Sequence, residues 1–147
     1  MSRFYDIDDA NATLAELGPI LSTLIDQRAE LVRLRDHILA HDAAGPGPAG
    51  DDGEVGAAVA NDLRFTRLRM LGLIDQMAAG VARIDELGIA LRDIPTGLVD
   101  FPALVNGRQV WLCWRRDEPT VLFWHRQDQG FDSRRSIADL EGTGRTA

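Results

Sequence analysis

Residues 97–131, GLVDFPALVNGRQVWLCWRRDEPTVLFWHRQDQGF, decide the fold of the C-terminal third of this 147-residue chain. Apolar and polar side chains alternate along this stretch, which is typical of β-strands that bury one face. Asn106-Gly107 separates two such runs and predicts a two-residue type I′ hairpin turn, because both residue types tolerate a positive φ. We therefore expect a small antiparallel β-meander of three to four strands over residues 89–126.

The Asn-Gly turn also predicts which residues of its two strands face each other. Val99 falls opposite Trp114 and Phe101 falls opposite Leu112, because side chains on one face of a strand recur every second residue. These pairs make one face of the meander almost wholly apolar. We expect that face to pack against helices.

The register of the fourth strand depends on the length of the second turn. A two-residue turn places His125 on the apolar face and sets Trp111 beside Trp124 on the opposite face. Two indoles on a face that should meet water suggest contact with a partner or a ligand. A one-residue shift of the fourth strand instead brings His125 to the face of Asp100 and Cys113.

A helical hairpin over residues 8–88 is expected to precede the meander. Apolar residues recur at intervals of three and four along both halves of this segment, as they do in amphipathic helices. Asp8 is the expected N-cap, and Gly88 is the expected end of the second helix. Pro19 predicts a kink or break, and the Gly/Pro-rich residues 43–53 predict a flexible linker.

Taken together, these patterns predict an α+β fold in a single domain, residues 1–147, that ends in a polar tail over residues 132–147. Two long helices with wide apolar stripes cannot enclose a core by themselves. A second copy of the chain would complete a four-helix bundle. We therefore expect a homodimer that forms through the helices.

Composition narrows the function classes. The net charge is -7 and all 16 basic residues are Arg, so the chain offers no basic surface for nucleic acid. No signal peptide or membrane-spanning run is evident, and one Cys cannot form an internal disulfide, so we expect a cytoplasmic protein with no membrane partner. Gly45, Gly47 and Gly50 match a G-x-G-x-x-G pattern, but no strand precedes them, so a dinucleotide site is not expected.

Several short motifs carry a resemblance to a known family. They are GLVDFP at 97–102, the Asn-Gly turn, VWLCW at 110–114, FWH at 123–125 with Glu118 before it, and GF at 130–131. With the helical hairpin ahead of them, they resemble a prokaryotic family known only as domain of unknown function 2203. The resemblance runs from the FYDIDDAN start, at residue 4, to Phe131. It implies membership of that family and no chemistry.

Asp100, Cys113 and His125 are the catalytic candidates, because these residue types form metal sites and Cys-His nucleophile pairs. Their spacing matches no known ligand pattern, so we expect neither a metal nor a cofactor. The alternative is structural: a mid-strand Cys is usually a small buried residue, and a His on an apolar face usually a hydrogen-bonded core residue.

Six further residues are candidates for a ligand or partner surface: Trp111, Arg115, Glu118, Trp124, Phe131 and Arg134. The arginines can bind an anion or pair with nearby acidic residues. The first functional hypothesis is a self-associating interaction or scaffold module that contacts a protein partner. The alternative is a small-molecule-binding protein or hydrolase with a site around Asp100, Trp124, His125 and a nearby Arg.

Overall fold

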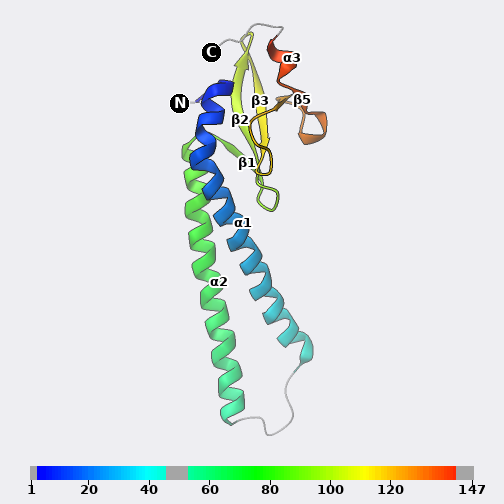
Figure 1. Ribbon diagram of the computed structural model, residues 1–147. Helices are drawn as coiled ribbons and strands as arrows, with labels where there is room; N and C mark the ends of the chain where they lie inside the picture. Colours follow the sequence, from blue (N-terminus) through cyan, green and yellow to red (C-terminus); the bar gives the residue numbers. More distant parts are fainter. Residues whose placement is uncertain (1–2, 46–52, 142–147) are drawn as a thin grey trace. The chain divides into compact units, whose positions relative to one another are not determined.

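A computed structural model of the chain describes residues 3–45 and 53–141 (Figure 1). Two long helices are followed by an antiparallel sheet, which confirms the α+β class. The chain divides into two compact units, residues 1–25 with 80–147 and residues 26–79. The elements in order are α1 Ile7–Ala44, α2 Glu54–Glu86, β1 Ala90–Asp93, β2 Leu98–Val105, β3 Arg108–Arg115, β4 Phe123–Arg126, the 3-10 helix Phe131–Ser133, β5 Arg135–Ser136 and α3 Ala138–Glu141.

The start of α1 differs from the expected one. The backbone N–H of Asp9 donates to Oδ1 of Asp6 at 2.7 Å, so Asp6 caps the helix, and the prediction of Asp8 is wrong. The helix also runs through Pro19 without a break. Pro19 is exposed, so the carbonyl that loses its helical hydrogen bond there lies on the solvent-facing side of the helix. Gly18 ahead of it has open space and no side chain to clash.

Ion pairs connect α1 with α2 inside each unit. Arg83 binds Glu16 at 2.5 Å in the first unit, and Arg69 binds Glu30 at 2.9 Å in the second. The residue numbers rise along α1 as they fall along α2, as antiparallel helices require. Gly88 ends α2 with a φ of 76°, as expected of a left-handed C-cap. The predicted helical hairpin is therefore confirmed.

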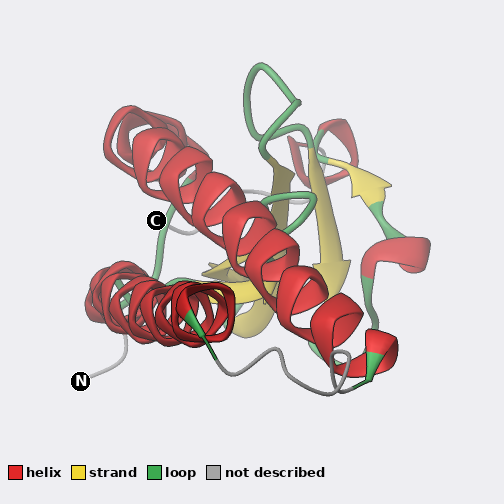
Figure 2. Cartoon of the chain, turned by 90° about the horizontal axis from the view of Figure 1, so that it is seen from below, coloured by secondary structure: helices red, strands yellow, loops and turns green. Residues whose placement is uncertain are grey.

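The sheet has five strands in the order β1-β2-β3-β4-β5; Figure 2 colours strands yellow and helices red. Asn106 and Gly107 have φ angles of 52° and 77°, which fits the predicted type I′ turn. The register that follows from that turn is also confirmed: Val99 pairs with Trp114, and Phe101 pairs with Leu112.

The apolar face of the sheet packs on the first part of α1. The ring of Tyr5, just before the helix, meets Phe101 edge-on with 5.1 Å between the ring centroids. Oδ1 of Asn11 accepts the backbone N–H of Val121 at 2.8 Å. Leu17 and the other buried leucines of this part of α1, Leu21 and Leu24, complete the core on the helix side. The opposite face of the sheet takes no part in this packing.

One expectation about the C-terminal segment needs correction. Residues 132–141 are not a polar tail: β5 pairs with β4, and Leu140 in α3 is 4% exposed. Residues 142–147 lie outside the described part of the chain, as do residues 46–52 of the expected linker. The described chain contains two long helices, so it does not itself form a four-helix bundle. None of its described helices is long and apolar enough to cross a membrane.

Candidate functional site

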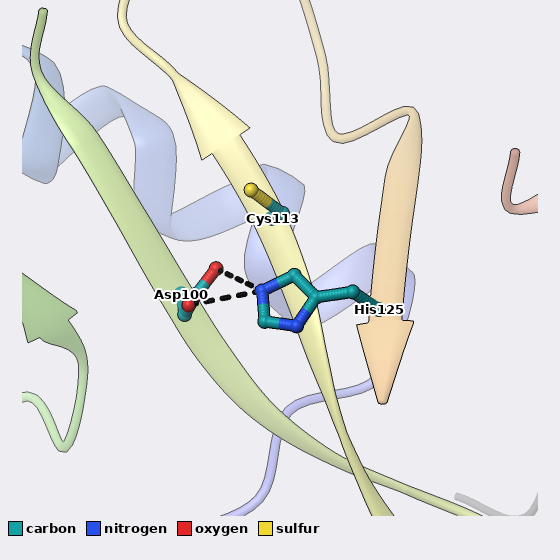
Figure 3. Close-up of side chains that lie close together, drawn as sticks. All are labelled: Asp100, Cys113 and His125. Atoms are coloured by element: carbon teal, nitrogen blue, oxygen red, sulfur yellow. Dashed lines mark hydrogen bonds and ion pairs between the residues drawn. The ribbon is translucent and has the colours of Figure 1, made fainter. Parts of the chain in front are cut away.

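The sheet brings Asp100, Cys113 and His125 together on one face. Asp100 in β2 pairs with Cys113 in β3, and His125 in β4 pairs with Trp111, two residues away from Cys113 on the same face. Figure 3 shows the three side chains converging from three adjacent strands. All three are buried, with 3%, 1% and 2% of their surface exposed.

This convergence corrects the expected register of the fourth strand. His125 pairs with Trp111 and so lies on the face of Asp100 and Cys113 rather than on the apolar face, which is the one-residue shift that the sequence left open. The second turn is longer than two residues, because β4 begins only at Phe123. Glu118 holds this connection: its carboxylate accepts the backbone N–H of Arg115 at 2.7 Å.

The same shift separates the two indoles. Trp124 pairs with Leu112, so it lies on the opposite face from Trp111, and the predicted surface carrying both rings is wrong. Nε1 of Trp124 donates to the carbonyl of Ser136 at 3.1 Å, and the guanidinium of Arg135 lies 5.6 Å from its ring. Trp124 therefore belongs to the packing of the C-terminal segment.

His125 is fixed by hydrogen bonds at both ring nitrogens. Nδ1 lies 2.9 Å from the carbonyl oxygen of Arg126, and Nε2 lies 3.1 Å from both carboxylate oxygens of Asp100. Arg92 donates from Nε to Oδ2 of Asp100 at 2.9 Å, and its guanidinium lies 4.9 Å from the Trp111 ring. The carboxylate is thus held between a guanidinium and an imidazole.

These contacts restrict what can lie between His125 and Asp100. A carbonyl oxygen only accepts, so Nδ1 of His125 must carry its hydrogen. Nε2 then faces two carboxylate oxygens, and that contact is favourable only with a proton or a metal ion between them.

Cys113 is a weak nucleophile in this setting. Burial, together with the nearby carboxylate of Asp100, raises the pKa of its thiol to about 12. The nucleophile in cysteine chemistry is the thiolate, which this environment disfavours. The arrangement therefore gives no support to a Cys-His nucleophile pair.

A cleft of about 400 Å³ opens over the three side chains. Its floor is polar, and the segment after β4 forms much of its wall. Arg92 and Gln129 also line it. They were not singled out from the sequence, because the irregular register of β1 at Arg92 and the path of the segment after β4 depend on contacts distant in sequence. The lining residues are Arg92, Leu98, Asp100, Cys113, His125, Gln127, Asp128, Gln129, Gly130 and Phe131.

A cluster around Arg134 secures this wall. The guanidinium of Arg134 lies 4.0 Å from the ring of Phe123 and 4.6 Å from the ring of Phe131. Nη2 donates to the carboxylate of Glu118 at 2.5 and 2.8 Å and to the carbonyl of Cys113 at 3.3 Å. The contact connects β3, β4 and the segment that covers the cleft.

Most of the predicted surface residues therefore lie around this one face. Phe131 lines the cleft, Glu118 and Arg134 belong to the cluster that supports its wall, and Trp111 lies under Arg92, which lines the cleft; Trp124 has none of these contacts. Arg115 extends over Phe131, 5.5 Å from the ring, and forms an ion pair with Asp117 at 2.7 Å. Arg115 therefore follows the ion-pair alternative rather than forming an anion pocket.

Comparison with known proteins agrees with the resemblance seen in the sequence. Residues 3–137 match the family described as "Uncharacterized conserved protein (DUF2203)". The chain belongs to this family. Searches of curated proteins and of solved structures found no match. The DUF2203 description assigns no activity, so we infer function from the geometry of the cleft.

Proposed function

We propose that this DUF2203 protein binds a small polar molecule in the sheet cleft, and that it does so in the cytoplasm. One observation carries the proposal: three polar side chains of different chemistry converge, buried, at the floor of an open cleft. Hydrolysis is the reaction class that such a floor supports, because it combines an imidazole, a carboxylate and a cleft that admits water.

Stability alone does not account for this floor. Burying a charged pair costs several kcal/mol for each ion, and well-packed apolar residues of similar volume are often at least as stable. The opposite face of the same sheet consists of such well-packed apolar residues, among them Val99, Phe101 and Leu112. Clustered buried ionisable groups in a cleft are typical of functional sites.

A ligand screen tests this proposal. We expect a phosphate ester, a carboxylate or a nucleotide from a panel of small polar molecules to raise the melting temperature of the wild-type protein. His125→Gln should abolish that shift, because it removes the imidazole from the floor. Asp132→Asn, which changes a carboxylate outside the cleft lining, is the control and should keep the shift. A panel that shifts neither the wild type nor the control contradicts the proposal.

We propose a second role, self-association through α2 of two copies of the chain. The apolar side chains Phe65, Leu68 and Leu71 are 72%, 61% and 60% exposed, and Ile74 continues the same row. Exposed rows of this kind mark protein contacts. Exposed Arg64 and Arg67 flank the start of the row and Asp75 follows its end, so antiparallel contact between two copies brings opposite charges together.

Light scattering tests this role. We expect a dimer mass for the wild type at micromolar concentration and a monomer mass for Leu68→Glu. The matched control is Leu122→Glu, the same change at an exposed leucine of the sheet unit, which should remain dimeric. A monomeric wild type, or a Leu68→Glu variant that stays dimeric, rules out this surface.

A further inference from the structure

The three side chains at the floor of the cleft offer an oxygen, a sulfur and a nitrogen donor to one point. The candidate donor atoms of Asp100, Cys113 and His125 all lie within 4.8 Å of one another. We propose that they bind one divalent metal ion of the zinc class. The inference rests on the proposed function, because it names what the floor of the same cleft holds when a small molecule binds there.

The distances between the donors are close to those that a zinc ion requires. Zinc binds nitrogen and oxygen at about 2.0–2.2 Å, so a tetrahedral site sets these atoms about 3.3 Å apart. Nε2 of His125 lies 3.1 Å from each carboxylate oxygen of Asp100. Little movement of these two side chains is therefore needed to admit the ion between them, with Sγ of Cys113 closing in from β3.

The orientation of His125 is the one found in metal-binding histidines. Its Nδ1–H donates to the backbone carbonyl of Arg126 at 2.9 Å. A ligating histidine almost always donates its other ring N–H to a carbonyl, a carboxylate or water, which fixes the tautomer and aims the free lone pair at the metal. The same bond leaves Nε2 of His125 directed at the carboxylate, where the ion would lie.

The carboxylate of Asp100 is supported in the same way. Arg92 donates to its Oδ2 at 2.9 Å and rests on the ring of Trp111, so one carboxylate oxygen is occupied and Oδ1 stays available. Hydrogen-bonded carboxylates of this kind are common around metal ligands. Arg92 is therefore a positioning residue for the site.

The donor set selects the class of metal. A metal ion that binds Cys113 displaces the thiol proton into solvent, so the ligand is a thiolate although the metal-free site favours the thiol. A thiolate, an imidazole and a carboxylate together suit zinc and similar borderline ions, whereas magnesium and calcium prefer oxygen ligands alone. Three protein ligands leave a fourth position, as in catalytic rather than structural zinc sites. The cleft of about 400 Å³ above the three residues can deliver water or a small molecule to that position.

One further feature of the cleft fits a bound ion with water. Oε1 of Gln129 is buried and has no hydrogen-bond partner among the described residues, and Gln129 lines the same cleft. A buried acceptor without a donor is costly. Water held in the cleft by a metal ion is a source of such a donor.

The test is metal binding by the purified full-length protein after treatment with a chelator. We expect one equivalent of zinc in equilibrium dialysis, and a cobalt-substituted protein that shows thiolate-to-metal charge-transfer absorption in the near ultraviolet. Asp100→Asn, Cys113→Ser and His125→Gln should each weaken zinc binding by about 100-fold or more. Asp128→Asn, a carboxylate that lines the cleft outside the three, should bind zinc as the wild type does.

Circular dichroism of each variant separates loss of the site from loss of the fold, and the cobalt spectrum of the wild type reports sulfur ligation without any variant. Less than half an equivalent of zinc on the wild type, or a cobalt spectrum without the charge-transfer band, overturns the inference. Zinc binding that Cys113→Ser leaves unchanged also overturns it. A small molecule that binds metal-free protein while zinc does not bind overturns the metal inference and keeps the proposed function. Tight zinc binding with no small-molecule ligand overturns the proposed function and keeps the metal inference.

Discussion

Single residues decide whether the cleft exists. Glu118 lies in the turn after β3, where its backbone N–H donates to the carbonyl of Arg115 at 2.8 Å. Its carboxylate also binds the backbone of Arg115 and the side chain of Arg134, so it joins the turn to the segment that covers the cleft. Local sequence propensity does not predict this double role of the Glu118 carboxylate, because Arg134 is distant in sequence.

Removing the charge of Glu118 should therefore destabilise the sheet unit. The side chains of Glu118 and Arg134 are each 11% exposed, and Glu118→Gln leaves a buried guanidinium without its counter-ion. We expect a loss of about 2–4 kcal/mol in the free energy of unfolding, measured by urea denaturation. Asp117→Asn removes the neighbouring carboxylate, which is exposed, and should leave the unfolding curve nearly unchanged. Equal effects of the two variants would show that Glu118 does not hold the turn.

Tyr5 provides a test of the core on the other face. Burial raises the pKa of its phenol, whose O–H donates to the carbonyl of Leu87 at 2.5 Å. The folded state therefore keeps the phenol neutral, and stability should fall as the pH rises past about 10, where an exposed tyrosine ionises. Tyr5 is the only tyrosine, so its phenolate absorbance can be followed directly.

We expect that absorbance to appear above pH 10 and together with unfolding. Tyr5→Phe should cost about 1–3 kcal/mol, because the buried carbonyl of Leu87 loses its donor. A phenolate that forms at the pH of free tyrosine, with the fold intact, would place Tyr5 outside the core.

Elements differ in how far their own sequence determines them. The β2–β3 hairpin is predictable in full, because Asn106-Gly107 fixes the turn type and hence each facing pair. The β3–β4 connection is not, because its length depends on contacts of Glu118 and Asn11 with distant residues. β5 was missed because two residues carry no periodicity. The candidate triad was named from residue types alone, whereas its convergence required the register of β4.

The hairpin turn makes a prediction of its own. Gly107 has a φ of 77°, so Gly107→Ala should destabilise the protein by about 1–2 kcal/mol, the cost of a left-handed conformation with a side chain. Gly72 lies inside α2, and a Cβ there meets nothing within 4 Å. Gly72→Ala should instead stabilise by about 0.5–1 kcal/mol. Thermal melting distinguishes the two signs, and the same sign for both would contradict the assigned turn.

At the scale of the whole molecule, the two faces of one sheet have different roles. One face is apolar and packs on the start of α1, as its alternating sequence predicts. The other carries Asp100, Cys113 and His125 beneath a cleft, and it gains this character only because β4 is shifted by one residue. The function we propose depends on that shift.

Anomalous diffraction at the zinc edge, from crystals grown with zinc, tests this arrangement most directly. We expect one strong peak bounded by Asp100, Cys113 and His125, with Trp124 on the opposite face of the sheet. A structure in which His125 lies on the face of Phe101 and Leu112, or a map with no peak at the three side chains, would contradict it.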